Sequence, residues 1–375
     1  MIIVVNTRFL LPDKLEGYGY FVKEVFNILS RNYPQHRFYF LFDRPYKSDF
    51  TFSSNIHPIV IGPPARIPLL WKFWFDYRVP AILKKTHADI FVSPDGFCSL
   101  RTKTPQLLVV HDLGFLHQPG AYKNSHQRFF RRYVSKFLNK ATNVATVSEF
   151  SRKDIMHQYK LPAEKISVVY NGVNEIFQPL SFDEQAKQKN LYTEGKEFFI
   201  YVGAIQPRKN LVSLLKAFSV FKKRQQTNMK LILVGRLAWK NDEFLNLLNT
   251  YKYKADVIMT GYLEQKKVAD LMASAYALVY PSLFEGFGIP VLEAMRSNTP
   301  VLTSKDSSME EIAEDAALYF NPVDHQEIAD QMMLIYKDEN LRKLMIERGK
   351  MITAKYSWER TAALLWQCIE RTIQG

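Results

Sequence analysis

The sequence predicts two Rossmann-like, doubly wound α/β domains, one after the other along the chain. Short β-branched and aromatic runs alternate with helix-like segments in both halves, which is the pattern of parallel βαβ units. The length of 375 residues exceeds what a single hydrophobic core usually supports. The series of strands also starts again after a polar stretch at residues 177–196, which we interpret as the linker region.

The predicted strands follow one another in a regular order. In the first half they are residues 1–6, 37–42, 57–62, 88–93, 106–111, 143–148 and 166–171. In the second half they are residues 197–204, 230–235, 257–262, 277–282 and 300–304. The last stretch, "YSWERTAALLWQCIERTIQG", has apolar residues at helical spacing and predicts an amphipathic helix. The predicted units are therefore residues 1–178, residues 179–356 and a final helix over 357–375.

Composition excludes several classes of protein. A hydrophobic content of 47% is too high for a disordered chain, and no apolar run approaches the roughly 18 residues of a membrane span. The opening "MIIVVNTRFL" is typical of a first strand rather than a signal peptide. The two cysteines, Cys98 and Cys368, are far apart, which favours a reducing cytosol over a disulfide framework.

The positive charge is concentrated in the first half of the chain. Residues 1–180 hold 24 Lys and Arg against 13 Asp and Glu, a net +11, whereas residues 181–375 hold 26 against 24, a net +2. Such a field attracts anions, among them nucleic acid, acidic lipid headgroups and phosphorylated small molecules. No recognised nucleic-acid-binding module accompanies it, so we expect no nucleic-acid partner.

The segment "PSLFEGFGIPVLEAM" carries two carboxylates beside a glycine-containing loop. Gly286 and Gly288 permit close backbone approach, and Pro290 suits the first position of a helix. A helix N-terminus beside such a loop can bind a diphosphate. Glu293, predicted in the first helical turn, and Glu285, in the loop, can bracket one ligand through its hydroxyls. Alternatively, Glu293 only complements the helix dipole and Glu285 is a solvated loop residue.

A second segment, "YVGAIQPRKNL", has the features of a phosphate site. A buried strand ends at Gly203, and Asn210 can cap the next helix. Arg208 and Lys209 stand directly before that helix, where two cations and free N–H groups would face an anion. An ordinary basic loop is the alternative.

The first half offers weaker signals. His111 and Asp112 end the strand "QLLVVHD", where the histidine could bind a ligand hydroxyl and the aspartate could orient it. A structural His–Asp pair is the alternative. Gly17 and Gly19 precede a helix but lack the third glycine of a dinucleotide fingerprint.

Common catalytic signatures are absent from the sequence. It contains no D-x-D pair, no HExxH, no GxSxG and no Walker motif. We therefore expect no bound metal and no cofactor.

In this combination the segments resemble the "glycosyl transferases group 1" family, whose members are retaining glycosyltransferases of the GT-B fold. The resemblance rests on "GYGYFVKEV", "VVHDLGF", "TVSEFSRKDI", "VVYNGVNEIFQP", "YVGAIQPRKNL", "TGYLEQKKVADLMASA" and the E-x7-E signature within "PSLFEGFGIPVLEAM". It implies two Rossmann-like domains facing a cleft, with the acceptor bound mainly by the first domain and a nucleotide-sugar donor by the second.

The resemblance implies which residues hold the diphosphate of the donor. Arg208 and Lys209 would neutralise it beside Gly203, and the helix after Gly288 would assist. Gly17 and Gly19 would let the first-domain loop approach the phosphates.

It also implies contacts to the sugar and the base. Glu285 and the backbone of Gly286, Phe287 and Gly288 would hold the sugar hydroxyls, and His111 would contact the same sugar. Among these, His111 and Glu285 are the predicted catalytic residues.

The nucleoside end of the donor is less closely defined. Glu293 would bind the ribose hydroxyls, and Tyr262 and Leu263 would contact the base. The expected reaction transfers a hexose of mannose or glucose type from a UDP- or GDP-sugar to a glycan or lipid-linked acceptor, in the cytoplasm, during polysaccharide or lipopolysaccharide synthesis. A two-domain nucleotide or sugar receptor and a sugar phosphorylase of similar fold are the alternatives.

Two basic and aromatic stretches, residues 69–85 and 128–141, suggest an anionic membrane surface as a partner. An enzyme peripheral on the inner face of the membrane would meet lipid-linked acceptors there. In the alternative reading the aromatic residues face the core and the cations are simply solvated.

Overall fold

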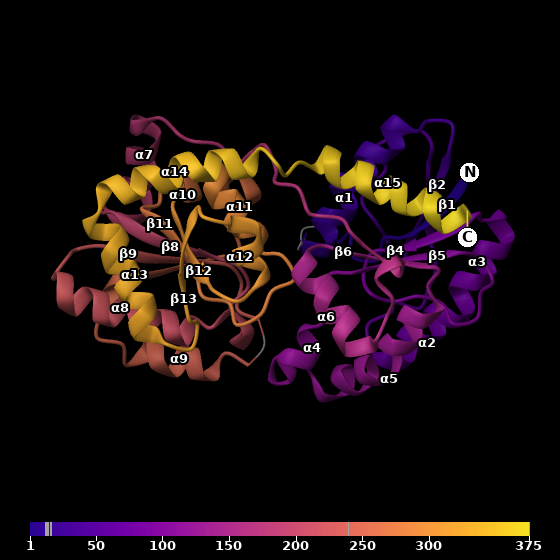
Figure 1. The fold of residues 1–375 in the computed structure, drawn as a ribbon, viewed down its shortest axis with the longest axis horizontal. Coiled ribbons are helices and arrows are strands. Elements are labelled where there is room, and N and C mark those ends of the chain that lie inside the picture. Colours follow the sequence, from indigo (N-terminus) through magenta and orange to yellow (C-terminus); the bar gives the residue numbers. More distant parts are fainter. Residues whose placement is uncertain (12–14, 16, 239, 375) are drawn as a thin grey trace. The chain divides into compact units, whose positions relative to one another are not determined.

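The computed structural model describes residues 1–11, 15, 17–238 and 240–374. It forms two compact units, one of Met1–Gly172 with Trp358–Gly375 and the other of Val173–Ser357 (Figure 1). Gly375, the last residue of the predicted final helix, lies outside the described residues.

The first unit is built on a seven-stranded parallel sheet of order β3-β2-β1-β4-β5-β6-β7. Its strands are β1 (Ile2–Asn6), β2 (Arg37–Phe42), β3 (Ile56–Val60), β4 (Ile90–Ser93), β5 (Gln106–Val110), β6 (Asn143–Thr146) and β7 (Ile166–Val168). The central strands β4 and β5 are fully buried, as expected when helices cover both faces. The strand order reverses between β1 and β4, which is where ligands of such sheets usually bind.

Two helical layers cover this sheet. The helices are α1 (Gly17–Asn32), α2 (Pro68–Phe73), α3 (Val79–Thr86), α4 (Gly114–His117), α5 (Asn124–Lys140), α6 (Glu149–Tyr159) and α15 (Trp358–Gln374). The final helix α15, drawn in yellow, packs along α1 on one face (Figure 1). Their apolar residues share one core, in which Phe26 of α1 and Leu365 of α15 are fully buried. The core of the opposite face includes Trp74 and Phe137.

The second unit contains a six-stranded parallel sheet of order β10-β9-β8-β11-β12-β13. Its strands are β8 (Phe198–Val202), β9 (Lys230–Val234), β10 (Val257–Gly261), β11 (Ala277–Tyr280), β12 (Val301–Ser304) and β13 (Ala317–Phe320). Both units thus confirm the predicted doubly wound fold class. Strand β13, which has four residues and lies at the edge of the sheet, was not predicted.

The helices of the second unit correct the linker prediction. They are α7 (Phe182–Thr193), α8 (Leu211–Gln225), α9 (Asp242–Asn249), α10 (Gln265–Ser274), α11 (Ile289–Arg296), α12 (Ser308–Ala313), α13 (His325–Lys337) and α14 (Glu339–Thr353). Residues 177–196 are not a linker, because they contain α7, which packs on α10. A capping box between Ser181 and Glu184 starts this helix, and that S-x-x-E spacing was the sequence signal for it.

The boundary between the units falls a few residues earlier than expected. It lies at 172/173 rather than 178/179, because Val173 and Phe177 are buried and belong to the second unit. The chain returns to the first unit at Trp358. Among the described residues, no helix is long and apolar enough to cross a membrane.

Candidate functional site

Three glycines stand at the carboxyl edge of the second sheet. Gly203, Gly235 and Gly261 follow or end the neighbouring strands β8, β9 and β10, and all three have positive φ angles. A Cβ on Gly235 would lie 2.0 Å from the carbonyl oxygen of Gly203, so only glycine fits this approach. The edge where ligands of parallel sheets bind is thus held in a compact backbone arrangement.

Arg208 links two loops at this edge. It lies in a short 3-10 turn, Pro207–Lys209, soon after β8. Its guanidinium donates to the carbonyl of Phe284 at 2.5 Å and to Oε2 of Glu285 at 3.1 Å. The backbone N–H of Leu283 donates in return to the carbonyl of Arg208 at 2.9 Å. The loops after β8 and β11 are therefore fixed to each other.

Lys209 completes this cluster. Its Nζ lies 2.5 Å from Oε1 of Glu285 and 2.5 Å from the hydroxyl of Tyr280. Burial alone would raise the pKa of Glu285, but the attraction of Arg208 and Lys209 outweighs it and lowers the pKa to about 2. The carboxylate is thus ionised between two cations, and the cluster of Arg208, Lys209 and Glu285 keeps one net positive charge.

Tyr280 and Tyr201 also lie at this site, although neither was predicted there. Both are fully buried, and their rings stack with centroids 5.9 Å apart beneath the cations. Burial is the main cause that raises the pKa of each hydroxyl well above its ordinary value. A tyrosine in an otherwise apolar strand was the available signal, since a buried hydroxyl needs a polar partner.

Hydrogen bonds from Ser308 of α12 fix the loop that leads into α11. The hydroxyl of Ser308 donates to the carbonyls of Glu285 and Phe287, at 2.8 and 3.2 Å. Gly288 caps α11 with a φ of 99°, and a Cβ there would lie 2.6 Å from Met309. The predicted loop residues Gly286, Phe287 and Gly288 are therefore held in one conformation beside Glu285.

Glu293 is not in the first turn of its helix, contrary to the prediction. Helix α11 begins at Ile289 rather than Pro290, so Glu293 is its fifth residue and cannot cap the N-terminus. Its side chain keeps part of its surface exposed, yet desolvation raises its pKa to about 8. At neutral pH the carboxyl of Glu293 is mostly protonated, able both to donate and to accept hydrogen bonds.

Replacing Glu293 by glutamine is expected to stabilise the ligand-free protein. In the unfolded chain this carboxyl ionises near its ordinary pKa of 4.5 but in the folded chain only near 8, so it lowers stability as pH rises between these values. Glu293→Gln should raise the free energy of unfolding by about 1–3 kcal/mol at pH 8 and by less at pH 5. Denaturant unfolding at both pH values measures this gain, and exposed Glu347→Gln on α14 is the control. An equal gain at both pH values would contradict the assignment.

Tyr262 and Leu263 follow β10 at the edge of the same sheet. The side chain of Tyr262 is 52% exposed, and Leu263 is half-buried. Among the described contacts, none joins Tyr262 or Leu263 to the cluster of Arg208, Lys209 and Glu285, so their contact with a base stays a prediction.

In the first unit, His111 lies at the carboxyl end of β5. Its Nε2 is 3.0 Å from the carbonyl of Pro94, and since a carbonyl only accepts, Nε2 carries the proton and Nδ1 is the acceptor. The rings of Tyr18 and Phe21 pack edge-on against it. Desolvation lowers the pKa of His111 to about 4 despite the bond to Pro94, so the imidazole is neutral at pH 7.

Pro94, rather than the expected Asp112, is the hydrogen-bond partner of the His111 ring. Asp112 accepts a bond from the backbone N–H of Gly114 at 2.8 Å, whereas the loop of Pro94 orients the imidazole. That loop is fixed by the buried ion pair between Arg8 and Asp95, which the sequence analysis missed because its partners are 87 residues apart.

The two predicted glycines of α1 differ in their surroundings. A Cβ on Gly19 would lie 2.8 Å from the carbonyl of Phe9, whereas one on Gly17 would have no neighbour within 4 Å. Gly19 therefore allows the start of α1 to approach the loop after β1, and Tyr18 between the glycines contacts His111.

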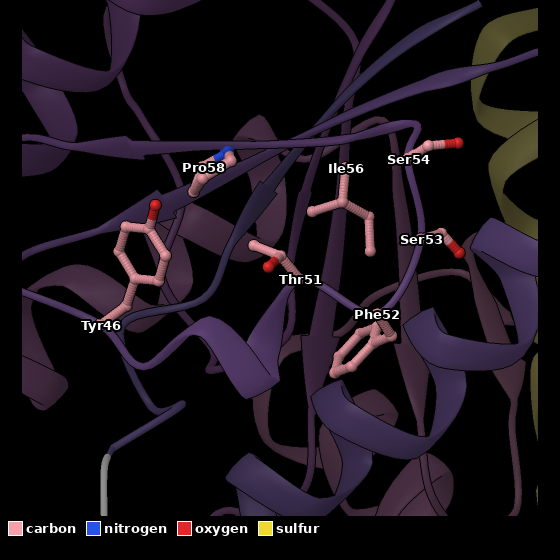
Figure 2. A pocket seen from close by; sticks show the side chains of 7 residues that line it. All are labelled: Tyr46, Thr51, Phe52, Ser53, Ser54, Ile56 and Pro58. Atoms are coloured by element: carbon pink, nitrogen blue, oxygen red, sulfur yellow. The ribbon is translucent and has the colours of Figure 1, made fainter.

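A separate hollow of about 430 Å³ lies at the edge of the first sheet. Figure 2 shows its lining, from the segment before β3 and from β3 itself: Tyr46, Thr51, Phe52, Ser53, Ser54, Ile56 and Pro58. It contains none of the predicted site residues and no charged side chain, so it does not match the expected ligand.

Two family models match the chain. "Glycosyl transferases group 1" matches residues 182–351, and "Glycosyltransferase Family 4" matches residues 26–176. The O-antigen chain mannosyltransferase RfbU of Salmonella typhimurium is 32% identical over 69% of this chain and 68% of its own length. O-antigen chain mannosyltransferase B of Escherichia coli is 29% identical over 66% of this chain. The alignment spans 66% of that second relative.

Solved structures match the fold over nearly the whole chain. The sucrose-phosphate synthase of Thermosynechococcus elongatus has a TM-score of 0.82 and 19% identity, with 99% of this chain and 98% of that chain covered. The HepE protein of Anabaena, solved with UDP-glucose, has a TM-score of 0.76 and 17% identity, with 99% and 100% covered. At this identity the likeness concerns the fold.

Proposed function

The chain belongs to the glycosyl transferases group 1 family, and from this premise we propose that it is a retaining hexosyltransferase that uses a nucleotide-sugar donor. The observation that carries the proposal is the cluster of Arg208, Lys209 and Glu285 at the carboxyl edge of the second sheet. It offers a positive charge for a diphosphate and an ionised carboxylate for sugar hydroxyls, side by side.

The cluster supplies the largest catalytic contribution in this proposal. As the bond from the sugar C1 to the diphosphate breaks, negative charge grows on the leaving oxygen, and the buried cations stabilise it. The acceptor oxygen forms the new bond to C1 on the same face, and its proton passes to the departing diphosphate. The ion pairs already position both cations, so little reorganisation is needed.

The remaining site residues have supporting roles. Glu293, with a raised pKa, is assigned to the ribose hydroxyls, and Tyr262 and Leu263 to the base. Neutral His111 is assigned to a sugar hydroxyl, from which its Nδ1 would accept a hydrogen bond. We expect no metal in this reaction, because Arg208 and Lys209 supply the charge that a divalent cation would otherwise provide.

The names of the relatives favour mannose as the transferred sugar and an O-antigen-type glycan as the acceptor. The HepE structure contains UDP-glucose, which favours a uridine donor. Guanosine donors are to be tested beside it. We place the reaction in the cytoplasm, peripheral on the inner face of the membrane, where a lipid-linked acceptor would be met.

Thermal stabilisation by nucleoside diphosphates tests this function. UDP or GDP without added metal, at about 100 times its dissociation constant, should stabilise the protein by about 2.7 kcal/mol. Arg208→Ala should abolish the shift, because it removes a cation from the diphosphate site. Arg224→Ala, which removes an exposed pair with Asp330 on the same unit, is the matched control and should keep the shift.

The receptor and the sugar phosphorylase alternatives predict different results when binding and consumption of the nucleotide sugar are measured. No response to any nucleoside diphosphate would overturn the transferase proposal. A receptor would bind the nucleotide sugar without consuming it, and a sugar phosphorylase would require inorganic phosphate.

A further inference from the structure

Large apolar side chains are exposed along one helical face of the first unit. Helices α2 and α3 are joined by a π-helical turn, Trp74–Arg78, into one continuous segment. Leu69, Phe73 and Tyr77 are 74%, 42% and 48% exposed, and their i, i+4, i+8 spacing places them on one side. The rings of Phe73 and Tyr77 stack with centroids 5.6 Å apart. Ile67, just before α2, is also exposed.

The surroundings of this face are strongly basic. Residues 66–86 and α5 together contain ten Lys and Arg and one carboxylate, Asp76. That carboxylate is buried, where it pairs with Lys72 at 2.6 Å and accepts from the N–H of Leu100. No acidic side chain of these segments therefore reaches the surface. Arg101 packs over the ring of Tyr77 at 4.3 Å and adds a further cation.

Helix α5 contributes charge without apolar exposure. It packs beside α2 (Figure 1), and its apolar residues Phe129, Phe137 and Leu138 are buried in the core. Its cations Arg128, Arg131, Arg132, Lys136 and Lys140 are exposed. For α5 the aromatic residues thus face the core, whereas the α2 segment turns aromatic and aliphatic side chains outward.

We propose that the face of Leu69, Phe73 and Tyr77, with the cations of α5 beside it, docks onto an anionic lipid surface. Apolar side chains that project from a basic helical surface insert at the level of the headgroups, while the cations contact lipid phosphates. A nucleic acid would use the cations but not an exposed leucine. A protein partner or a second copy would need carboxylates to oppose about ten positive charges.

Vesicle binding of the full-length protein tests this surface. The protein should sediment with vesicles of phosphatidylcholine that contain phosphatidylglycerol. Binding should be at least about tenfold weaker to vesicles of phosphatidylcholine alone, and high salt should weaken binding to the anionic vesicles by a similar factor. Leu69→Ser/Phe73→Ser should lower binding to the anionic vesicles by about tenfold or more. Arg128→Gln/Arg131→Gln should lower it through the charge alone, by about fivefold per cation.

Phe182→Ser/Leu191→Ser is the matched control, because it removes two large exposed apolar side chains from α7 of the second unit. It should bind as the wild type does. All substituted positions are exposed, so unchanged thermal unfolding verifies the fold of each variant. Equal binding of wild type and Leu69→Ser/Phe73→Ser would overturn the proposal. The proposal would also fail if Leu69→Ser/Phe73→Ser abolished a dimer seen by light scattering and left vesicle binding unchanged. The face would then join two copies of the chain. The assay contains no nucleotide, so its outcome is independent of the proposed transferase activity.

Discussion

Lys209→Ala is expected to lower kcat by about 10²- to 10³-fold, because it removes a preorganised cation from the departing diphosphate. It should also destabilise the fold by about 3 kcal/mol at pH 7, since Glu285 stays buried with one of its two cationic partners missing. Steady-state kinetics and denaturant unfolding measure the two effects on the same preparation.

A double variant separates structure from catalysis. Lys209→Met/Glu285→Gln replaces two of the three charges of the cluster by neutral side chains of similar size, while Arg208 keeps its bond to the carbonyl of Phe284 and can still donate to the amide oxygen at position 285. Such a replacement often restores much of the lost stability. We expect it to unfold within about 1 kcal/mol of the wild type and to remain inactive. Recovery of activity together with stability would show that the pair only supports the fold. Lys305→Ala, which removes an outer ion pair with Glu327, should leave kcat unchanged.

The pH dependence of unfolding checks the same pair. The pKa of Glu285 is depressed from 4.5 to about 2, so its contribution to stability is complete above pH 4.5 and is lost as pH falls toward 2. The difference in unfolding free energy between the wild type and Lys209→Ala should therefore narrow at low pH. A difference that widens would contradict the depressed pKa.

The substitutions His111→Asn and His111→Gln are expected to have unequal effects. The side-chain oxygen of asparagine can occupy roughly the position of Nδ1, the acceptor proposed for the sugar hydroxyl, whereas glutamine reaches the position of Nε2 beside Pro94. His111→Gln should lower kcat by about 10²-fold, whereas His111→Asn should stay within about tenfold of the wild type. The reverse order would show that the bond to Pro94, rather than Nδ1, matters for activity.

The lowered pKa of His111 provides an independent readout. Its pKa falls from 6.5 to about 4 in the folded protein, so the folded state loses stability as pH falls from 6.5 toward 4. Both variants should remove this loss, whatever their activity. Between pH 6.5 and 8 the histidine stays neutral, and kcat should show no transition due to it.

Much of the fold could be predicted from local sequence patterns. Each buried parallel strand is a short apolar run, so sequence patterns predicted twelve of the thirteen strands that the described residues form. Strand β13 was missed although β4, β6, β11 and β12 have the same length; it lies at the edge of its sheet, where Leu318 and Tyr319 are only half-buried. Helix α7 was missed because its capping box was overlooked. The start of α11 differed by one residue, since Gly288 rather than Ile289 occupies the cap.

The sequence alone determined that two parallel α/β units form and which loops are candidates for a ligand site, because periodicity, glycines and helix starts are local properties. Only the tertiary structure decided how those residues combine. It brought Arg208 and Lys209 to Glu285, 76 or 77 positions away, and placed Tyr280 beneath them. It also placed the carbonyl of Pro94 beside His111. It turned Leu69, Phe73 and Tyr77 outward, whereas Phe129 and Phe137 of α5 are buried. Partners distant in sequence, burial and the resulting pKa values depend on packing between elements, which no local pattern records.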